Sequence, residues 1–428
     1  MKNPHHFKKL TLRRDLNLFQ AISCGIGIIV GAGIYVLLGP AAALAGNAVW
    51  ISFIISALLA LFTGLSYAEL NSLFPKDSGE YTYVKKTFNK KLAFLIGYTI
   101  FLGGSISAAT VSLGFAGYLS SLINYNLVLL ASLLLISMTI INLFSTKDLS
   151  YLNVLLTALQ IIGLIFIVIM SLKYFGSVNY LESPKGIKGI FNASSLIFFA
   201  YIGFESLVKL SEETKNPKKI IPIALISSII FATILYILVA ISAISTLGYE
   251  VLSKSKAPLT DVISKSLGSE FSLIITIIAL ISTASTVLLI LLATSRILYG
   301  ISKDIKSLKI FTKISENTRT PYIALISVLV LSILFVLIGN IEIVASITNF
   351  TIYLTFFFVN LSLIILRYTK PNLKRKFRTP LNIKNFPITA LLGLISSLIF
   401  ILNLQLKIIF GGIVLILIGL ILDKMIKK

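Results

Sequence analysis

Long apolar runs alternate with short polar segments along nearly the whole chain. A membrane-spanning helix needs about 20 mostly apolar residues to cross a hydrocarbon core that is roughly 30 Å thick. Twelve runs meet this length, so the pattern predicts an all-α membrane protein with twelve transmembrane helices. The runs cover residues 17–38, 48–73, 92–119, 126–144, 151–172, 192–208, 220–247, 270–295, 321–339, 343–366, 386–403 and 406–422.

The composition agrees with a lipid bilayer as the surroundings of this chain. Of its 428 residues, 57% are hydrophobic and 13% are charged, whereas soluble domains carry about 25% charged residues. The net charge of +22 would suit a nucleic-acid-binding protein. The charges lie in short segments between apolar runs, however, so we expect no nucleic-acid partner.

The basic residues predict an orientation. When the N-terminus is placed inside, all but seven of the 38 lysines and arginines fall on that side. The seven outside are Lys173, Lys185, Lys188, Lys254, Lys256, Lys265 and Lys407. Because cytoplasmic segments are enriched in basic residues, we predict a multi-pass plasma-membrane protein with both termini cytoplasmic. Residues 1–16 then form the cytoplasmic N-terminus before an uncleaved first helix.

Two connecting segments have a helix-like pattern of their own. Residues 252–267 place apolar side chains at helical spacing, which predicts a short helix on the outer side. Residues 303–319 are basic, which predicts a short amphipathic helix at the cytoplasmic headgroups. No connecting segment is long enough for a soluble domain.

The first apolar run contains four glycines between residues 25 and 33, in the sequence Gly-Ile-Gly-Ile-Ile-Val-Gly-Ala-Gly. Each glycine costs a helix about 1 kcal/mol relative to alanine. A helix that breaks within hydrocarbon must satisfy its freed backbone groups, so it usually lines a cavity where those groups bind a polar solute. The alternative is close helix packing, because Gly27 and Gly31 form a GxxxG pair.

The sixth run contains a second interruption. Residues 198–205 read Phe-Phe-Ala-Tyr-Ile-Gly-Phe-Glu, with a glycine and a carboxylate inside an apolar run. Runs one and six are five spans apart and therefore enter the membrane from opposite sides. This is the arrangement of two inverted five-helix repeats with a solute site where broken helices meet. We predict a first repeat over residues 17–176, a second over 190–367, and two peripheral helices over 385–424.

Helix ends indicate the chemistry of that solute site. A helix that begins near Gly31 would offer its first N–H groups to an anion such as a carboxylate. Unwound carbonyls would accept hydrogen bonds from an ammonium group, so the pair of sites suits a free α-amino acid. The predicted substrate-binding residues are Ile29, Gly31, Ala32, Gly33, Phe199, Ala200 and Ile202.

Short motifs occur in a fixed order over roughly residues 15–425. They lie at 27–34, 67–70, 74–75, 78–81, 198–205, 212–213, 216–217, 221–222, 296 with 299, 321 and 376–381. In this order they resemble the amino acid–polyamine–organocation (APC) superfamily, in particular its cationic-amino-acid-transporter-like permeases. The resemblance implies a LeuT-type fold, with a 5+5 inverted repeat plus two peripheral helices, and alternating access to a central amino acid.

The resemblance also implies roles for individual residues. By motif, Ala32 and Gly33 would face the substrate carboxylate, and the carbonyls of Ile29, Phe199 and Ile202 would face its ammonium group. Phe199 matches a position where relatives place a bulky gate. The sequence departs from the family in its fifth span and in the loop after the eighth. Some proton-coupled members carry a lysine in the fifth span, and the nearest match to it here is Gln160. In the loop after the eighth span, residues 303–306 replace the family's usual Gly-x-Leu-Pro.

Two polar residues are our candidates for coupling transport to a second ion. Glu205 aligns with a family position proposed to bind protons; the alternative is a helical ion pair with Lys209. Gln160 is a candidate brace among the first, fifth and eighth spans, or a satisfied buried amide. Glu69, a second acid at membrane depth, favours a structural role that anchors the following loop.

Four hydroxyl side chains gather in the eighth span, where sodium-coupled relatives of this fold supply ligands. We favour the alternative that these hydroxyls bond to carbonyls of their own helix. The four are Ser282, Thr283, Ser285 and Thr286.

The residue types present argue against two other classes of protein, membrane enzymes and channels. The sequence lacks His-Glu-x-x-His and Gly-x-Ser-x-Gly motifs and any Cys/His cluster, and its only histidines are His5 and His6. We therefore expect no catalytic residue, metal site or cofactor. A channel would need polar or charged pore rings, which are too few here. The sequence predicts a secondary active transporter of amino acids. Its mechanism could be proton symport, amino acid/polyamine exchange or uniport. The exact substrate, any use of sodium and the oligomeric state are also left open by the sequence.

Overall fold

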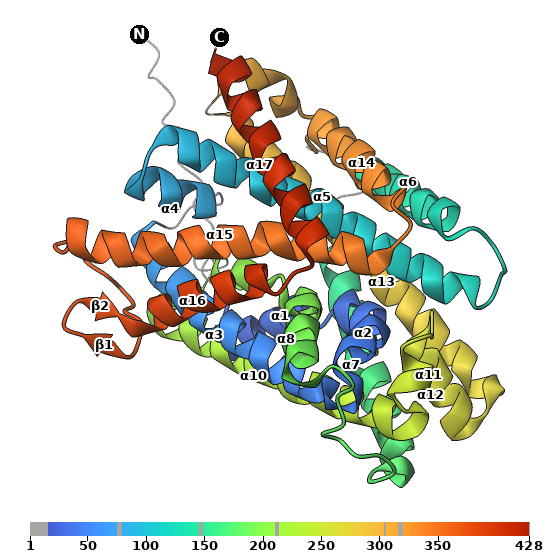
Figure 1. Ribbon diagram of the computed structural model, residues 1–428. Helices are drawn as coiled ribbons and strands as arrows, with labels where there is room; N and C mark the ends of the chain where they lie inside the picture. The colour runs from blue at the N-terminus through green and yellow to red at the C-terminus, as the bar shows by residue number, and fades with distance from the viewer. Residues whose placement is uncertain are drawn as a thin grey trace.

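A computed structural model describes residues 16–74, 79–144, 149–209, 214–303, 305–315 and 320–427 (Figure 1). Helices make up nearly all of it. The helices of the first half are α1 (Leu18–Ile29), α2 (Ala32–Ala45), η1 (Gly46–Ala48), α3 (Val49–Leu73), α4 (Gly79–Thr87), α5 (Lys90–Ser120), α6 (Leu127–Phe144), α7 (Leu149–Ser171) and η2 (Leu172–Tyr174).

The second half continues in the same way. Its helices are α8 (Gly186–Ile197), η3 (Phe198–Tyr201), α9 (Phe204–Lys209), α10 (Pro217–Leu247), α11 (Tyr249–Leu252), α12 (Pro258–Leu267), α13 (Ser269–Ser302), η5 (Lys306–Thr312), α14 (Tyr322–Val336), α15 (Ile341–Thr369), α16 (Ile388–Leu402) and α17 (Leu406–Lys427). A two-stranded antiparallel hairpin of β1 (Asn382–Ile383) and β2 (Phe386–Pro387) precedes α16.

Helices of membrane-spanning length dominate the described part of the chain. Nine helical segments there are long and apolar enough to cross a bilayer, and α1, α14 and α16 are shorter apolar helices. Each of the twelve predicted apolar runs overlaps one of these helices. The prediction of an all-helical membrane protein is therefore confirmed.

The first and sixth runs are interrupted, as the glycines predicted. The helix that opens the first run ends at Ile29, and a second one starts at Ala32 and continues to Ala45, beyond the predicted end at 38. In the sixth run, α8 gives way to η3 before α9 starts at Phe204. Gly203 lies between them with φ +116°, a conformation that strains any residue with a Cβ.

Long helices surround these interruptions. In Figure 1, α15 runs across the middle of the view, with α3 and α16 below it and α5 above it. α10 packs along α1 and α3, and α13 packs along α5. α6 and α14 lie side by side at one edge of the bundle. Both interrupted segments therefore lie inside a wall of continuous helices.

The connecting segments match the predictions in part. Residues 252–267 do contain a helix, α12. In the described part of the basic segment 303–319, the helical element is the 3₁₀ helix η5. Nine positions of the predicted motifs and loops lie outside the described residues: Pro75, Ser78, Glu212, Glu213, Asp304, Glu316, Asn317, Thr318 and Arg319. So do residues 1–15 of the predicted cytoplasmic N-terminus.

Candidate functional site

The helix α2 begins at a bare N-terminus. Gly31 is its N-cap in an extended conformation (φ −134°, ψ −151°), and no side chain caps it. The last helical bond of α1 runs from the N–H of Val30 to the carbonyl of Ile26 at 2.7 Å, and the backbone of Val30 (φ −74°, ψ 90°) then leaves the helical conformation. The first N–H groups of a helix have no intrahelical partner and carry a partial positive charge. Ala32 and Gly33 are the first residues of this uncapped helix, and anion binding by their N–H groups stays a prediction.

The two interruptions touch each other. A Cβ built on Gly33 would lie 2.4 Å from the Cα of Ala200, so α2 packs directly on η3. A Cβ on Gly203 would lie 2.9 Å from a methyl carbon of Ile28 at the end of α1. Real Cβ atoms do not come so close to other heavy atoms, so glycine at both positions permits the contact.

A tyrosine of α10 joins the two segments. The hydroxyl of Tyr236 lies 2.8 Å from the carbonyl of Ile29 and 3.1 Å from that of Ala200, and its side chain is fully buried. Because a hydroxyl has one proton, it donates to one carbonyl at a time. The sequence analysis did not identify Tyr236, although a hydroxyl in the middle of an apolar helix indicates that it has a polar partner inside the protein.

A second set of side chains, from α15, holds the end of α8. The amide nitrogen of Asn349 donates to the carbonyls of Ser195 and Leu196 at 2.7 and 2.8 Å. The Tyr353 hydroxyl donates to the Ser195 carbonyl at 2.7 Å. These bonds satisfy carbonyls that the helix break leaves over. Both side chains were also missed, and Asn349 is a polar residue in an otherwise apolar stretch.

The predicted ammonium acceptors are partly engaged already. The carbonyl of Ile29 accepts from Tyr236, and that of Phe199 accepts the N–H of Ile202 at 3.3 Å. A carbonyl oxygen has two lone pairs, so each can accept once more. Phe199 and Ala200 are buried, whereas Gly31 and Ile202 keep part of their surface exposed.

Gln160 links three helices. Its side-chain amide donates to the hydroxyl of Ser285 on α13 at 3.4 Å, and its backbone carbonyl accepts from the hydroxyl of Tyr35 on α2 at 3.1 Å. Gln160 itself lies on α7 and is 4% exposed. The side chain therefore joins α7 to α13, whereas the backbone makes the contact with α2, and a bracing role for the amide stays a prediction.

One hydroxyl of the α13 cluster, that of Thr286, lies at the first interruption. A Cβ on Gly31 would lie 3.4 Å from the hydroxyl of Thr286. Thr283, Ser285 and Thr286 donate to carbonyls of their own helix, as expected. The buried hydroxyl of Ser282 has no hydrogen-bond partner.

Glu205 is tied to the second interruption. Its carboxylate accepts the N–H of Gly203 at 2.9 Å, which holds the turn before α9. The alternative partner, the side chain of Lys209, lies outside the described residues.

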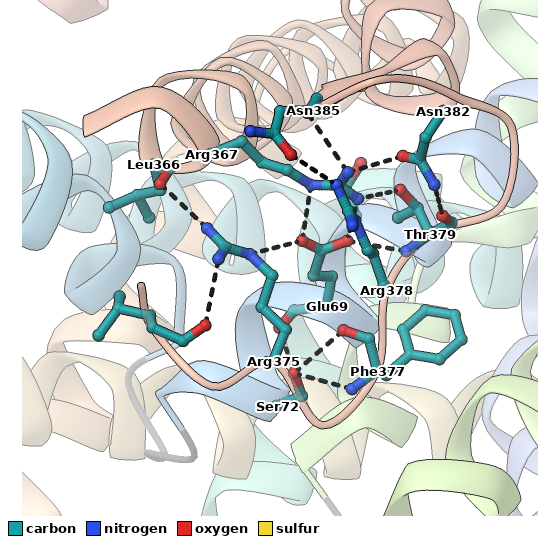
Figure 2. Close-up of polar contacts among 12 residues, drawn as sticks. Glu69, Ser72, Leu366, Arg367, Arg375, Phe377, Arg378, Thr379, Asn382 and Asn385 are labelled. Atoms are coloured by element: carbon teal, nitrogen blue, oxygen red, sulfur yellow. Dashed lines mark hydrogen bonds and ion pairs between the residues drawn. The ribbon is translucent and has the colours of Figure 1, made fainter. Parts of the chain in front are cut away.

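Glu69 lies in a separate buried cluster (Figure 2). Its carboxylate accepts from Nε and Nη2 of Arg367 at 2.9 and 2.6 Å, from Nε of Arg375 at 3.2 Å, and from the N–H of Thr379 at 2.8 Å. We call Glu69, Arg367, Arg375 and Thr379 the Glu69 cluster. It joins α3 to α15 and to the segment before β1. The structural reading of Glu69 therefore holds, although these partners lie far along the chain and not in the loop that directly follows.

Within the described ranges, no group of three or more His, Cys, Asp or Glu side chains is placed to hold a metal ion.

Comparison with known proteins agrees with this architecture. Residues 16–414 match the family model for amino acid permeases. A branched-chain amino acid permease of Bacillus subtilis is 28% identical over 96% of this chain and 92% of its own length. A methylthioribose transporter of Bacillus subtilis is 29% identical over 87% of this chain and 85% of its own. Mouse cationic amino acid transporter 4 is 28% identical over 84% of this chain and 61% of its own. Because the family model spans nearly the whole chain, this protein belongs to the amino acid permease family of the APC superfamily, whose members are transporters and not enzymes.

Proposed function

We propose that this protein carries a free α-amino acid across the plasma membrane by alternating access, with its substrate held between the two helix interruptions. The observation that carries the proposal is their contact: Gly33 packs on Ala200, and Tyr236 joins Ile29 to Ala200.

The substrate is held by backbone groups. The uncapped N–H groups of Ala32 and Gly33 bind the carboxylate, because a helix N-terminus favours an anion. The remaining lone pairs of the Ile29 and Phe199 carbonyls and the carbonyl of Ile202 bind the ammonium group. This arrangement recognises what all α-amino acids share.

The membrane architecture consists of twelve spans in a 5+5 inverted repeat of LeuT type. The broken α1–α2 and α8–α9 helices open the repeats over residues 17–176 and 190–367, and α16 and α17 are peripheral. The distribution of basic residues supports a cytoplasmic location for both termini. A break in corresponding helices of two repeats is the usual sign of a transporter's binding site.

Glu205 is the proposed coupling residue. Its bond to the Gly203 N–H means that adding or removing a proton acts directly on the turn between η3 and α9. Gln160 braces the site but has no proton to exchange, so it does not replace a coupling lysine. Exchange of one amino acid for another, or for a polyamine, is the alternative mechanism.

An apolar amino acid is the proposed substrate class. The residues at the interruptions are apolar, and Glu69, which could attract a basic side chain, is bonded to two arginines. The permease of Bacillus subtilis that is named for branched-chain amino acids agrees with this choice. The relative named for methylthioribose has a similar sequence identity to this chain, so a neutral thiosugar is the competing substrate.

Uptake by proteoliposomes that contain the purified chain tests the proposal. We expect labelled leucine or valine to accumulate in empty vesicles when a pH gradient is imposed, and an excess of unlabelled leucine to compete. Uptake only into vesicles preloaded with an amino acid or polyamine would establish exchange. Competition by methylthioribose but by no amino acid would contradict the proposed substrate.

A further inference from the structure

A pocket lies beside the Glu69 cluster, where α15 ends and the β1–β2 hairpin begins. It has a volume of about 250 Å³. Its lining residues are Arg367, Pro371, Leu373, Arg375, Arg378 and Asn385. Three of these six side chains are guanidinium groups, so the walls are strongly cationic.

Among the described residues, Glu69 is the one carboxylate bonded to the arginines that line this pocket. The side chains of Arg367 and Arg375 are 1% and 10% exposed, and they share the single carboxylate of Glu69. Residues 370–387 add five further basic residues besides Arg375 and contain no acidic residue. Bringing unpaired charge out of water is costly. An anion in the pocket would offset that cost.

Burial, with smaller contributions from Arg367 and Arg378, lowers the pKa of the Arg375 guanidinium against the opposing effect of Glu69. An arginine nevertheless keeps its charge in proteins. The lowered pKa therefore reflects mainly the removal of this guanidinium from water.

The arginines divide into two roles. All five N–H donors of Arg367 are used, on Glu69, Thr379, Asn382 and the Asn385 carbonyl. Those of Arg375 are used on Glu69 and four carbonyls at the end of α15. These two side chains form fixed walls that supply charge.

Arg378 is the side chain with donors to spare. It is exposed, and its one bonded nitrogen, Nη2, donates to the Lys384 carbonyl and to the side-chain oxygen of Asn385. Among the described residues, its Nε and Nη1 donors and the amide nitrogen of Asn385 have no partner, so they remain for a ligand. A guanidinium and an amide at the mouth of a cationic pocket suit the oxygens of a phosphate group.

We propose that this pocket is a binding site for a phosphate-bearing anion, held by Arg378 and Asn385 against the charge of Arg367 and Arg375. The site lies at the end of a membrane helix, where the phosphates of lipid headgroups are found, and a soluble phosphate compound has the same chemistry. A bound anion would strengthen the joint between α3 and α15. The inference does not depend on the transported solute.

Thermal unfolding and lipid binding of the purified full chain test the inference. Pyrophosphate is titrated at constant ionic strength, and binding of phosphatidylglycerol against phosphatidylcholine is counted by native mass spectrometry. We expect saturable binding that Arg378→Gln weakens roughly tenfold or more, since a hydrogen bond to a charged group contributes at least that much. Asn385→Asp keeps the acceptor for Arg378 and adds a negative charge, so it should abolish binding.

Lys376→Gln is the matched control. It removes an equal charge from an exposed residue of the same loop that does not line the pocket, so its affinity should stay within about twofold of the parent, because an exposed charge contributes little. Binding of phosphatidylglycerol alone would identify a lipid headgroup, and binding of pyrophosphate alone a soluble phosphate compound. The inference would be overturned if no anion bound saturably, or if Lys376→Gln lost as much affinity as Arg378→Gln.

Discussion

The helix interruptions at residues 30–31 and 198–203 are held mainly by neutral hydrogen bonds, with the Glu205 carboxylate on the Gly203 N–H as a single-charge contact, whereas the Glu69 cluster is held by ion pairs. At the interruptions, Tyr236 and Asn349 donate to carbonyls that the broken helices leave over. In the Glu69 cluster, one buried carboxylate accepts bonds from two arginines. Both regions are buried and polar, yet they differ in what it costs to break them.

The difference indicates which region is built to move. A neutral hydrogen bond contributes only about 0.5–1.5 kcal/mol net and can be exchanged for another. Breaking a buried ion pair costs about 3–5 kcal/mol, because it leaves a buried charge without its partner. We infer that the interruptions change during transport while the Glu69 cluster stays as a fixed joint. Four substitutions test this comparison, from the largest expected effect to the smallest.

Arg367→Met should be the most damaging change. It leaves Glu69 with only Arg375 and the Thr379 N–H, so we expect a loss of about 3–5 kcal/mol in stability. Thermal unfolding in detergent measures it. Lys374→Met, at an exposed residue of the neighbouring segment, is the control. A loss below about 1 kcal/mol would mean that the ion pair of Arg367 contributes no more than an exposed surface ion pair. The proposed energetic difference between the two regions would then be wrong.

Gly33→Ala should abolish uptake at a smaller cost in stability. The added methyl would meet the backbone of Ala200, and such overpacking costs about 1–3 kcal/mol. The measurement is leucine uptake by proteoliposomes with equal amounts of folded protein. Gly300→Ala is the control, because a Cβ on this helical glycine meets nothing within 4 Å. Normal uptake by Gly33→Ala would argue against a substrate site at this contact.

Tyr236→Phe should slow transport while the fold stays intact. It removes the hydroxyl that joins Ile29 to Ala200, which is worth about 1 kcal/mol. We expect a several-fold lower initial uptake rate and a small fall in melting temperature. Tyr125→Phe, at a tyrosine that is 63% exposed, is the matched control. Equal rates for the two variants would show that the bridge has no part in transport.

Glu205→Gln should have the smallest effect on stability, below about 0.5 kcal/mol, which is usual for a change that keeps the local contacts. The amide oxygen of glutamine can still accept the Gly203 N–H. Because the amide binds no proton, uptake should lose its response to an imposed pH gradient while exchange in preloaded vesicles continues. An unchanged response to the gradient would reject Glu205 as the proton site.

The interruptions themselves were predictable from the sequence, because glycines act locally. Gly31 and Gly203 disfavour a continuous helix wherever they occur, so the end of α1 at Ile29 and the turn before α9 followed from the chain alone. The charges between apolar runs likewise indicated a membrane protein, since burying them in hydrocarbon is costly.

The partners of those broken segments could not be predicted, because they come from distant parts of the chain. Nothing in the sequence shows that Tyr236 faces both Ile29 and Ala200, or that Asn349 reaches the end of α8. For the same reason, Glu69 had no visible partner until α3 and α15 were packed together.

The sequence by itself determined the helical membrane class, the apolar runs and the places where the helices break. These properties depend on hydrophobicity and on backbone freedom, which act over a few residues. The tertiary structure alone decided that the two breaks meet, that Tyr236 bridges them, and that three arginines line one pocket around a single buried carboxylate. Such contacts join residues that are far apart in the chain, and only the packing of the helices brings them together.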